Sequence, residues 1–146
     1  MAEKVKGRSM NRVIELLKEK NDYLEKFHAI NEHELINFIA GDFDNVELFY
    51  QTRDKILELI NCVDGLLEDE NERMVIGVTE AHRATAAKLF AAKDRLVESI
   101  LAQDLQILEF IEKEKSAIIR ELRTTNTARR AVGAYATVER AKLLEE

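Results

Sequence analysis

The side chains of this 146-residue sequence that could hold a metal are few and scattered. A two-metal carboxylate site in a helical bundle needs a Glu-x-x-His motif on each of two helices and a further Glu on each of two others. Glu25 and His28 form one copy of this motif, whereas Glu80 and His82 are only two residues apart and cannot form a second. The sequence therefore predicts no metal site.

Nucleophilic catalysis is not indicated either. The single cysteine, Cys62, lies in an apolar run without a neighbouring activator, so we expect a packed and unreactive thiol. One cysteine can form neither an internal disulfide nor a Cys-rich zinc site. Gly41 and Gly77 are isolated, which leaves no glycine-rich phosphate loop. We expect a protein that is not an enzyme, with no catalytic residues, no cofactor and no metal.

The composition restricts the fold that must position these side chains. The chain has no Pro and five Gly, while 34% of its residues are charged and 46% are hydrophobic. Pro and Gly favour turns, so a chain nearly without them makes few turns, which excludes sandwiches, barrels and doubly wound sheets of this size. The sequence predicts an all-α fold: an elongated antiparallel helical hairpin or three-helix bundle with one very long third helix and a C-terminal tail.

Apolar residues recur at steps of three and four along most of the chain, which is typical of amphipathic helices. The pattern predicts three helices, at about residues 9–40, 45–70 and 79–125. Ser9 and Thr79 are good N-cap residues for the first and third of these helices. With no composition shift along the chain, we expect a single helical domain over residues 1–146.

The connections between the helices are short. Gly41 suits the left-handed residue that follows the end of a helix. Residues 74–78 fit either an extended connector or a continuation of helix. The turn-favouring side chains of residues 124–127 should end or fray the third helix. We expect residues 126–146 to form a mobile or loosely docked tail.

Charge and hydropathy narrow the classes of partner. The formal net charge is −6, and an acidic balance argues against phosphate-backbone binding, which needs a basic footprint. No apolar stretch approaches the roughly 20 residues that a membrane span requires. Residues 1–20 lack the apolar centre of a signal peptide. We expect a soluble, cytoplasmic protein that binds no nucleic acid and does not insert into membranes.

Asp104 interrupts the apolar seam of the third predicted helix between Leu101 and Leu108. One interpretation places it at the edge of the seam, partly wet and paired with an Arg or Lys. The other makes it a polar group between helices that fixes their register, as a single polar residue can in a coiled coil. Arg53, on the second predicted helix, is a candidate partner.

The C-terminal third carries the main functional indication. The third predicted helix is longer than the two earlier ones can cover, and uncovered apolar surface usually marks a partner site. The predicted partner-binding residues are Ile111, Ile118, Ile119, Leu122, Val132, Tyr135 and Val138. The alternative is a structural coiled-coil interaction module that forms a homodimer through this C-terminal apolar stripe.

Several segments follow one another in a characteristic order. They are LINFIAGDFD at residues 35–44, RDKIL at 53–57, ILAQDL at 100–105, IIREL at 118–122 and ARRAVGAY at 128–135. In this order and spacing they resemble the flagellar type III export chaperones of the FlgN/FliT type. The resemblance covers about residues 10–136.

This resemblance implies a small cytosolic chaperone for late flagellar export substrates, such as hook–filament junction or filament-cap proteins. It also implies that the end of the third helix and the tail engage a C-terminal helix of the substrate. Carried onto this sequence, those positions are Ile111, Ile118, Leu122, Tyr135 and Val138. The export apparatus would be a second partner.

Overall fold

The computed structural model describes the backbone of residues 2–73 and 79–145 and the side chains of residues 10–72 and 79–134. Its elements are three α-helices: α1 (Ala2–Ile39), α2 (Val46–Arg73) and α3 (Glu80–Glu145). No strand occurs in these ranges, which confirms the predicted all-α class with a long third helix. The two alternatives for residues 74–78 lie outside the described residues.

Two helix ends differ from those predicted. α1 begins at Ala2, so its backbone is already helical at Ser9. α3 continues to Glu145, which makes the predicted helix end at Thr125 wrong and places residues 126–145 in helix. The reason is local: Thr127 Oγ1 donates a hydrogen bond to the carbonyl oxygen of Arg123 at 2.8 Å, which Thr can do inside a helix without breaking it.

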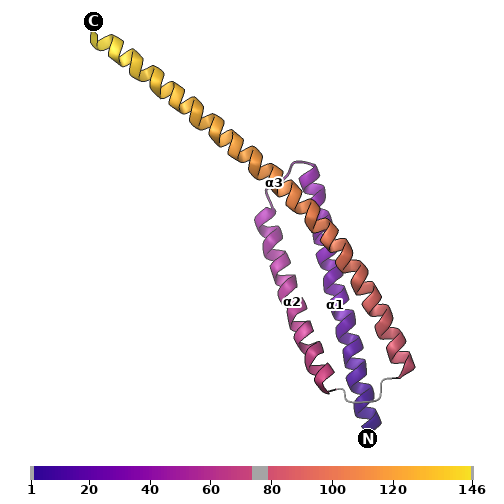
Figure 1. Cartoon of the computed structure of the whole chain (residues 1–146). Coiled ribbons are helices and arrows are strands. Elements are labelled where there is room, and N and C mark those ends of the chain that lie inside the picture. The colour runs from indigo at the N-terminus through magenta and orange to yellow at the C-terminus, as the bar shows by residue number, and fades with distance from the viewer. Residues whose placement is uncertain (1, 74–78, 146) are drawn as a thin grey trace. The chain divides into compact units, whose positions relative to one another are not determined.

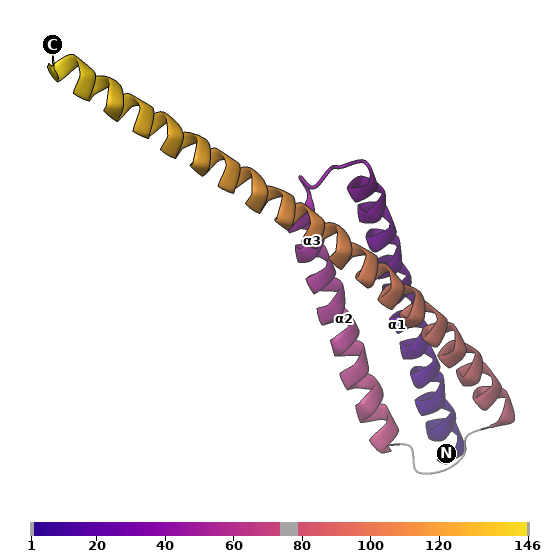
Figure 2. The same ribbon diagram turned by 45° about the horizontal axis from the view of Figure 1, so that its top comes forward.

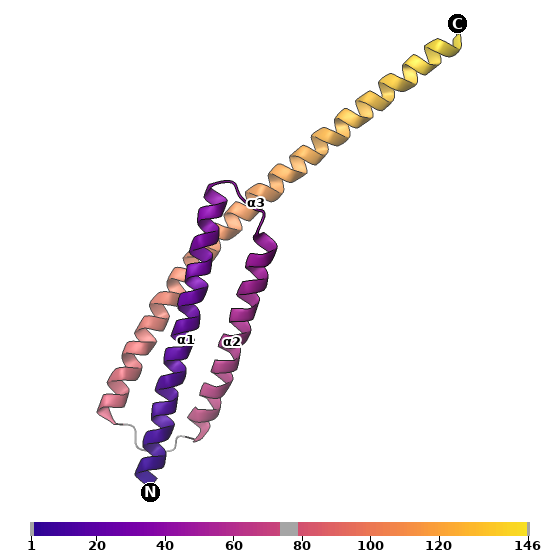
Figure 3. The ribbon, with the colours of Figure 1, turned by 180° about the vertical axis from the view of Figure 1, so that it is seen from behind.

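The contacts between residues divide the chain into two units, Met1–Ile107 and Leu108–Glu146. In the first unit α1 lies beside both α2 and the first part of α3; α2 runs antiparallel to α1, and α3 runs in the same direction as α1 (Figure 1). The same neighbours are seen after a 45° turn (Figure 2) and from behind (Figure 3). The second unit is the continuous helical run of α3 from Leu108 to Glu145. The single domain expected from the sequence stays a prediction.

The connection between α1 and α2 is a glycine-capped turn. Gly41 has a φ of 79°, as predicted for the left-handed residue past a helix end. The amide of Gly41 donates to the Phe38 carbonyl at 3.0 Å, and that of Asp42 donates to the Asn37 carbonyl at 2.9 Å. These two bonds form a Schellman motif, which satisfies the last carbonyl groups of α1 and reverses the chain. The rings of Phe38 and Phe43 stack across the turn with centroids 4.7 Å apart.

The start of α3 is capped as predicted. The amide of His82 donates to Thr79 Oγ1 at 3.2 Å, so Thr79 is the N-cap residue. Glu80 adds an acidic side chain to the first turn, where the helix dipole favours it. Local sequence is therefore sufficient to begin this helix.

Two clusters of buried apolar side chains form the core of the first unit. One contains residues from all three helices: Leu24, Phe27, Ile56, Ile60 and Ile100. The other joins α1 to the start of α3 and contains Met10, Val13, Leu17 and Ala86. Burial of such side chains is the main source of stability for a bundle of this kind.

Candidate functional site

The residues considered for metal chemistry are not gathered into a site. Glu25 is exposed on α1, and His28 Nδ1 lies 3.9 Å from Glu32 Oε2 on the same helix. Within the part of the chain that the structure describes, no three His, Cys, Asp or Glu side chains are grouped so that they could hold a metal ion. Among the described residues, the Glu25 and His28 motif therefore has no further ligand group beside it with which to hold a metal.

The prediction of a packed thiol at Cys62 is wrong. Its side chain is exposed, whereas Ile60 and Val63, on either side of it, are buried. Each residue of a helix is rotated by about 100° from the one before, so Cys62 lies about 200° from Ile60 and faces away from the core. An apolar stretch of sequence does not bury every residue within it.

The predicted partner-binding residues lie on the second unit. Ile118 is 48% exposed and Leu122 58% exposed, and both lie on the same face as Ile111, which is half-buried. Ile119, also exposed, lies about 80° to one side of Ile111, and Val132 lies about 60° to the other. The side chains of Tyr135 and Val138 lie outside the described residues.

We call the face formed by Ile111, Ile118 and Leu122 the apolar stripe. The residues along it alternate in steps of four and three, as in a coiled-coil seam: Ile111, Lys115, Ile118, Leu122, Thr125, Arg129 and Val132. At about 100° per residue, Arg123 and Arg130 border one side of the stripe and Glu114 and Glu121 the other. The exposed Glu112 lies on the same side as the two arginines, so one edge carries two arginines and a glutamate and the other carries two glutamates.

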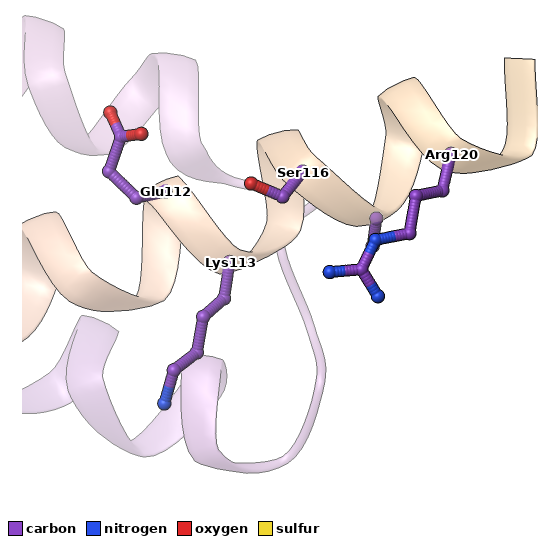
Figure 4. A pocket seen from close by; sticks show the side chains of 5 residues that line it. Glu112, Lys113, Ser116 and Arg120 are labelled. Atoms are coloured by element: carbon purple, nitrogen blue, oxygen red, sulfur yellow. The ribbon is translucent and has the colours of Figure 1, made fainter. Parts of the chain in front are cut away.

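A shallow hollow lies on a different face of the same helix. Figure 4 shows Ser116 between Glu112 and Arg120, with Lys113 beside them. All four side chains are exposed, and they carry charges of both signs. Such an open, mixed surface has none of the enclosed apolar walls of a small-molecule site.

The structure separates the paired apolar residues of α3 into inner and outer members. Ile100 and Ile107 are 7% and 1% exposed, whereas the residues that follow them, Leu101 and Leu108, are 59% and 54% exposed. Phe90 and Val97 are also exposed. Adjacent residues of a helix point about 100° apart, so both members of such a pair cannot face the same core.

Asp104 is paired with Arg53, the partner suggested by the sequence. Asp104 Oδ1 accepts hydrogen bonds from Arg53 Nη2 at 3.1 Å and from Asn31 Nδ2 at 3.2 Å. The Asp104 side chain is 31% exposed, so it is partly wet, and it also joins all three helices. Asp104 is thus both a partly exposed residue paired with an arginine and a polar group between helices, as the two interpretations from the sequence proposed separately.

Aromatic rings surround the guanidinium of Arg53. Its central carbon lies 4.7 Å from the ring centroid of Phe27, 5.2 Å from that of Phe49 and 5.5 Å from that of Tyr50. The faces of aromatic rings attract a guanidinium, and the rings also exclude water from it. Asp104 supplies the opposite charge that such a desolvated cation requires.

Two further polar contacts set the position of α3 along α1. Gln103 Nε2 donates to the carbonyl oxygen of His28 at 3.1 Å, and Asn21 Nδ2 donates to that of Leu89 at 3.1 Å. Neither Asn21 nor Gln103 was predicted from the sequence as a contact residue. Their only sequence signal is an amide residue on an apolar face. Such hydrogen bonds are lost when one helix shifts along the other, so they favour one register.

No match was found when the chain was compared with protein-family models, curated proteins and solved structures. Within the described residues, no helix is long and apolar enough to cross a membrane. The arrangement suited to interaction is an exposed apolar stripe with charged edges, carried by one long helix.

Proposed function

We propose that this chain is a chaperone that binds an amphipathic helical segment of another protein through the apolar stripe of α3. The observation that carries the proposal is the exposure of Ile118 and Leu122 on one helix face, with the exposed Ile119 beside them. Aliphatic side chains at such spacing are the usual anchors of helix-in-groove and helix-to-helix recognition. By packing these side chains against a partner helix, the chain would shield the apolar face of that helix from water.

The expected affinity is moderate. Five or six aliphatic anchors at about 1.5–3 kcal/mol each contribute roughly 10–15 kcal/mol before costs. Association and ordering remove roughly 4–15 kcal/mol of this, which leaves a micromolar-class, reversible contact. A chaperone that must later release its client needs reversibility of this kind.

The charged edges would orient the client. Arg123 and Arg130 border the side of the stripe on which Ile119 lies, while Glu114 and Glu121 border the other. A client helix with acidic residues along one edge and basic residues along the other would match both edges in one orientation only. Charge patterns of this type contribute specificity more than affinity.

The client class follows from the resemblance to export chaperones of the FlgN/FliT type. We infer a late flagellar substrate of the hook–filament junction or filament-cap type, with the export apparatus as a second partner and the cytoplasm as the compartment. The segments that carry this inference include IIREL and ARRAVGAY, which contain Ile118, Leu122 and Val132 of the predicted binding surface.

A homodimer through the same stripe is the alternative. Lys115 and Arg129 occupy seam positions between the apolar residues. In a parallel, in-register dimer each would face its own copy, and like charges across a seam are destabilising. This observation favours a different protein as the occupant over a second copy in that arrangement.

The test is a titration of the full-length chain with the C-terminal helical segment of a filament-cap or hook–filament junction protein, followed by calorimetry. Leu122→Asp should weaken binding at least about tenfold, because it places a charge in the apolar contact. Ser116→Asp is the matched control: it adds the same charge to the same helix on a different face and should leave the affinity unchanged.

Equal affinities for the wild type and Leu122→Asp would refute the proposed surface. Absence of binding to either class of segment would refute the flagellar assignment. Light scattering distinguishes the alternative, since a homodimer requires a concentration-dependent increase in mass that Leu122→Asp abolishes.

A further inference from the structure

A hollow of about 300 Å³ lies between α1 and α2, near the turn that joins them. Its apolar lining includes Ile30, Leu48 and Phe49, and its polar lining includes Glu34 and Asn37. Leu48 is 62% exposed at its rim, so the hollow is open to solvent. This site lies in the first unit and shares no residue with the apolar stripe.

Glu34 is an unusual residue for this position. It is 4% exposed, although it is an acidic side chain on a helix of a small bundle. Its Oε1 atom is buried and has no hydrogen-bond partner among the residues that the structure describes. Its Oε2 atom accepts from Asn37 Nδ2 at 3.4 Å, a long hydrogen bond. A buried carboxylate with so little compensation is costly and normally has a cationic partner.

The cations of the first unit that form ion pairs across helices are committed elsewhere. Arg53, the basic residue of α2 nearest in sequence to the lining residue Phe49, pairs with Asp104. Lys20 pairs with Asp64 at 2.6 Å. Neither of these two ion pairs includes Glu34. The carboxyl group of Glu34 therefore lies at the hollow without either of these cations as a partner.

We propose that this hollow binds an arginine side chain of a partner polypeptide. The Glu34 carboxylate would accept hydrogen bonds from the guanidinium, whose fork of donors matches two carboxylate oxygens. Ile30 and Leu48 would contact the aliphatic stem, which long basic side chains bury readily.

The same bundle already holds one arginine in this manner. Arg53 lies against Phe49 and two further aromatic rings and pairs with a carboxylate. The hollow presents a carboxylate beside apolar side chains, and its other titratable lining residue is the exposed His33 rather than an arginine. Lysine fits less well, because its compact ammonium cannot make the planar, two-pronged contact.

The test uses the full-length protein labelled for NMR and a blocked peptide, acetyl-Leu-Arg-Leu-amide. Its control is the same peptide with citrulline, which keeps the shape but removes the charge. The arginine peptide should shift the side-chain amide signals of Asn37 and the methyl signals of Leu48 and Ile30. The citrulline peptide should bind at least about tenfold more weakly, as expected when a charge-assisted hydrogen bond is lost.

Two variants make the result specific. Glu34→Gln should abolish the preference for arginine over citrulline and, because it removes an uncompensated buried charge, should raise the melting temperature. Glu32→Gln, which changes an exposed acid on the same helix, should leave both unchanged. Equal affinity for the two peptides, or an arginine preference that survives Glu34→Gln, would overturn the proposal. Leu122→Asp should not affect binding of the arginine peptide. The arginine site and the proposed function can therefore be refuted independently of each other.

Discussion

Arg53 Nη2 lies 3.1 Å from Asp104 Oδ1 and thereby joins α2 to α3 across 51 residues of sequence. The Arg53 side chain is 14% exposed and that of Asp104 is 31% exposed, so bulk water cannot fully replace either partner. Asn31, which is fully buried on α1, donates to the same carboxylate oxygen. The three helices therefore meet at one carboxylate.

Replacing Asp104 should destabilise the bundle. Asp104→Ala leaves a largely buried guanidinium without its counter-charge, and we expect the free energy of unfolding to fall by about 2 kcal/mol. The measurement is urea unfolding followed by circular dichroism. Asp94→Ala is the control, because Asp94 is on the same helix and its side chain is 72% exposed. It should change the stability by less than about 0.5 kcal/mol. Equal effects of the two substitutions would contradict a structural role for the Arg53–Asp104 pair.

Two glycines should respond in opposite directions to alanine. Gly41 has a φ of 79°, so Gly41→Ala should cost about 1 kcal/mol or more. Gly65 lies inside α2, and an added Cβ would meet nothing within 4 Å. Gly65→Ala should therefore stabilise the protein by about 0.5–1 kcal/mol. Thermal unfolding of both variants checks this, and a shift of the same sign in both would be inconsistent with the left-handed turn at Gly41.

Tyr23 should ionise at a higher pH than free tyrosine. Partial burial raises the pKa of its phenol above 10.0, and the carboxylate of Glu19, which accepts its hydrogen bond at 3.2 Å, adds to the effect. A raised pKa in the folded state favours the protonated form. Its contribution to stability is therefore present below pH 10 and lost as the pH rises through the folded-state value.

Ultraviolet absorbance of phenolate during an alkaline titration measures this ionisation. Tyr23→Phe identifies the transition that belongs to Tyr23, and Glu19→Gln should move that transition toward lower pH. A Tyr23 transition at or below that of free tyrosine would show that the contact with Glu19 is not made in solution.

Two apolar residues of α3, Ile107 and Leu122, should differ sharply in their effect on stability. Ile107 is 1% exposed, so Ile107→Ala should cost about 2–4 kcal/mol through lost burial and a residual cavity. Leu122 is 58% exposed, and Leu122→Ala should change the free energy of unfolding by no more than about 0.5 kcal/mol. Chemical unfolding of both variants tests the distinction. A large loss of stability in Leu122→Ala would mean that Leu122 is buried within the folded chain itself.

Features that depend on a few neighbouring residues were predictable. The Gly41 turn and the Thr79 cap follow from local backbone chemistry, because the hydrogen bonds that define them join residues at most five positions apart. The end of α3 was mispredicted for a related reason. The hydroxyl of Thr127 can either form a hydrogen bond that favours a turn or donate to the carbonyl four residues before it within a helix. The local sequence is compatible with both.

The candidate sites were predictable in part. The predicted partner-binding residues follow from spacing along α3, and the structure shows that Ile118, Ile119, Leu122 and Val132 are exposed. The hollow beside Glu34 was not foreseen, because nothing within α1 distinguishes a buried Glu from the exposed Glu32 two residues earlier. That difference arises from tertiary packing, since residues of α2 lie beside Glu34.

The sequence by itself determined that this protein is helical, where its first turn lies and where its third helix begins, since propensity, capping and periodicity act over a few residues. Only the tertiary structure decided that Ile100 is buried and Leu101 exposed, that Asp104 meets Arg53, and that Glu34 is enclosed. These outcomes depend on how three helices are rotated and shifted against each other. That arrangement is set by the sum of many contacts between residues far apart in the chain.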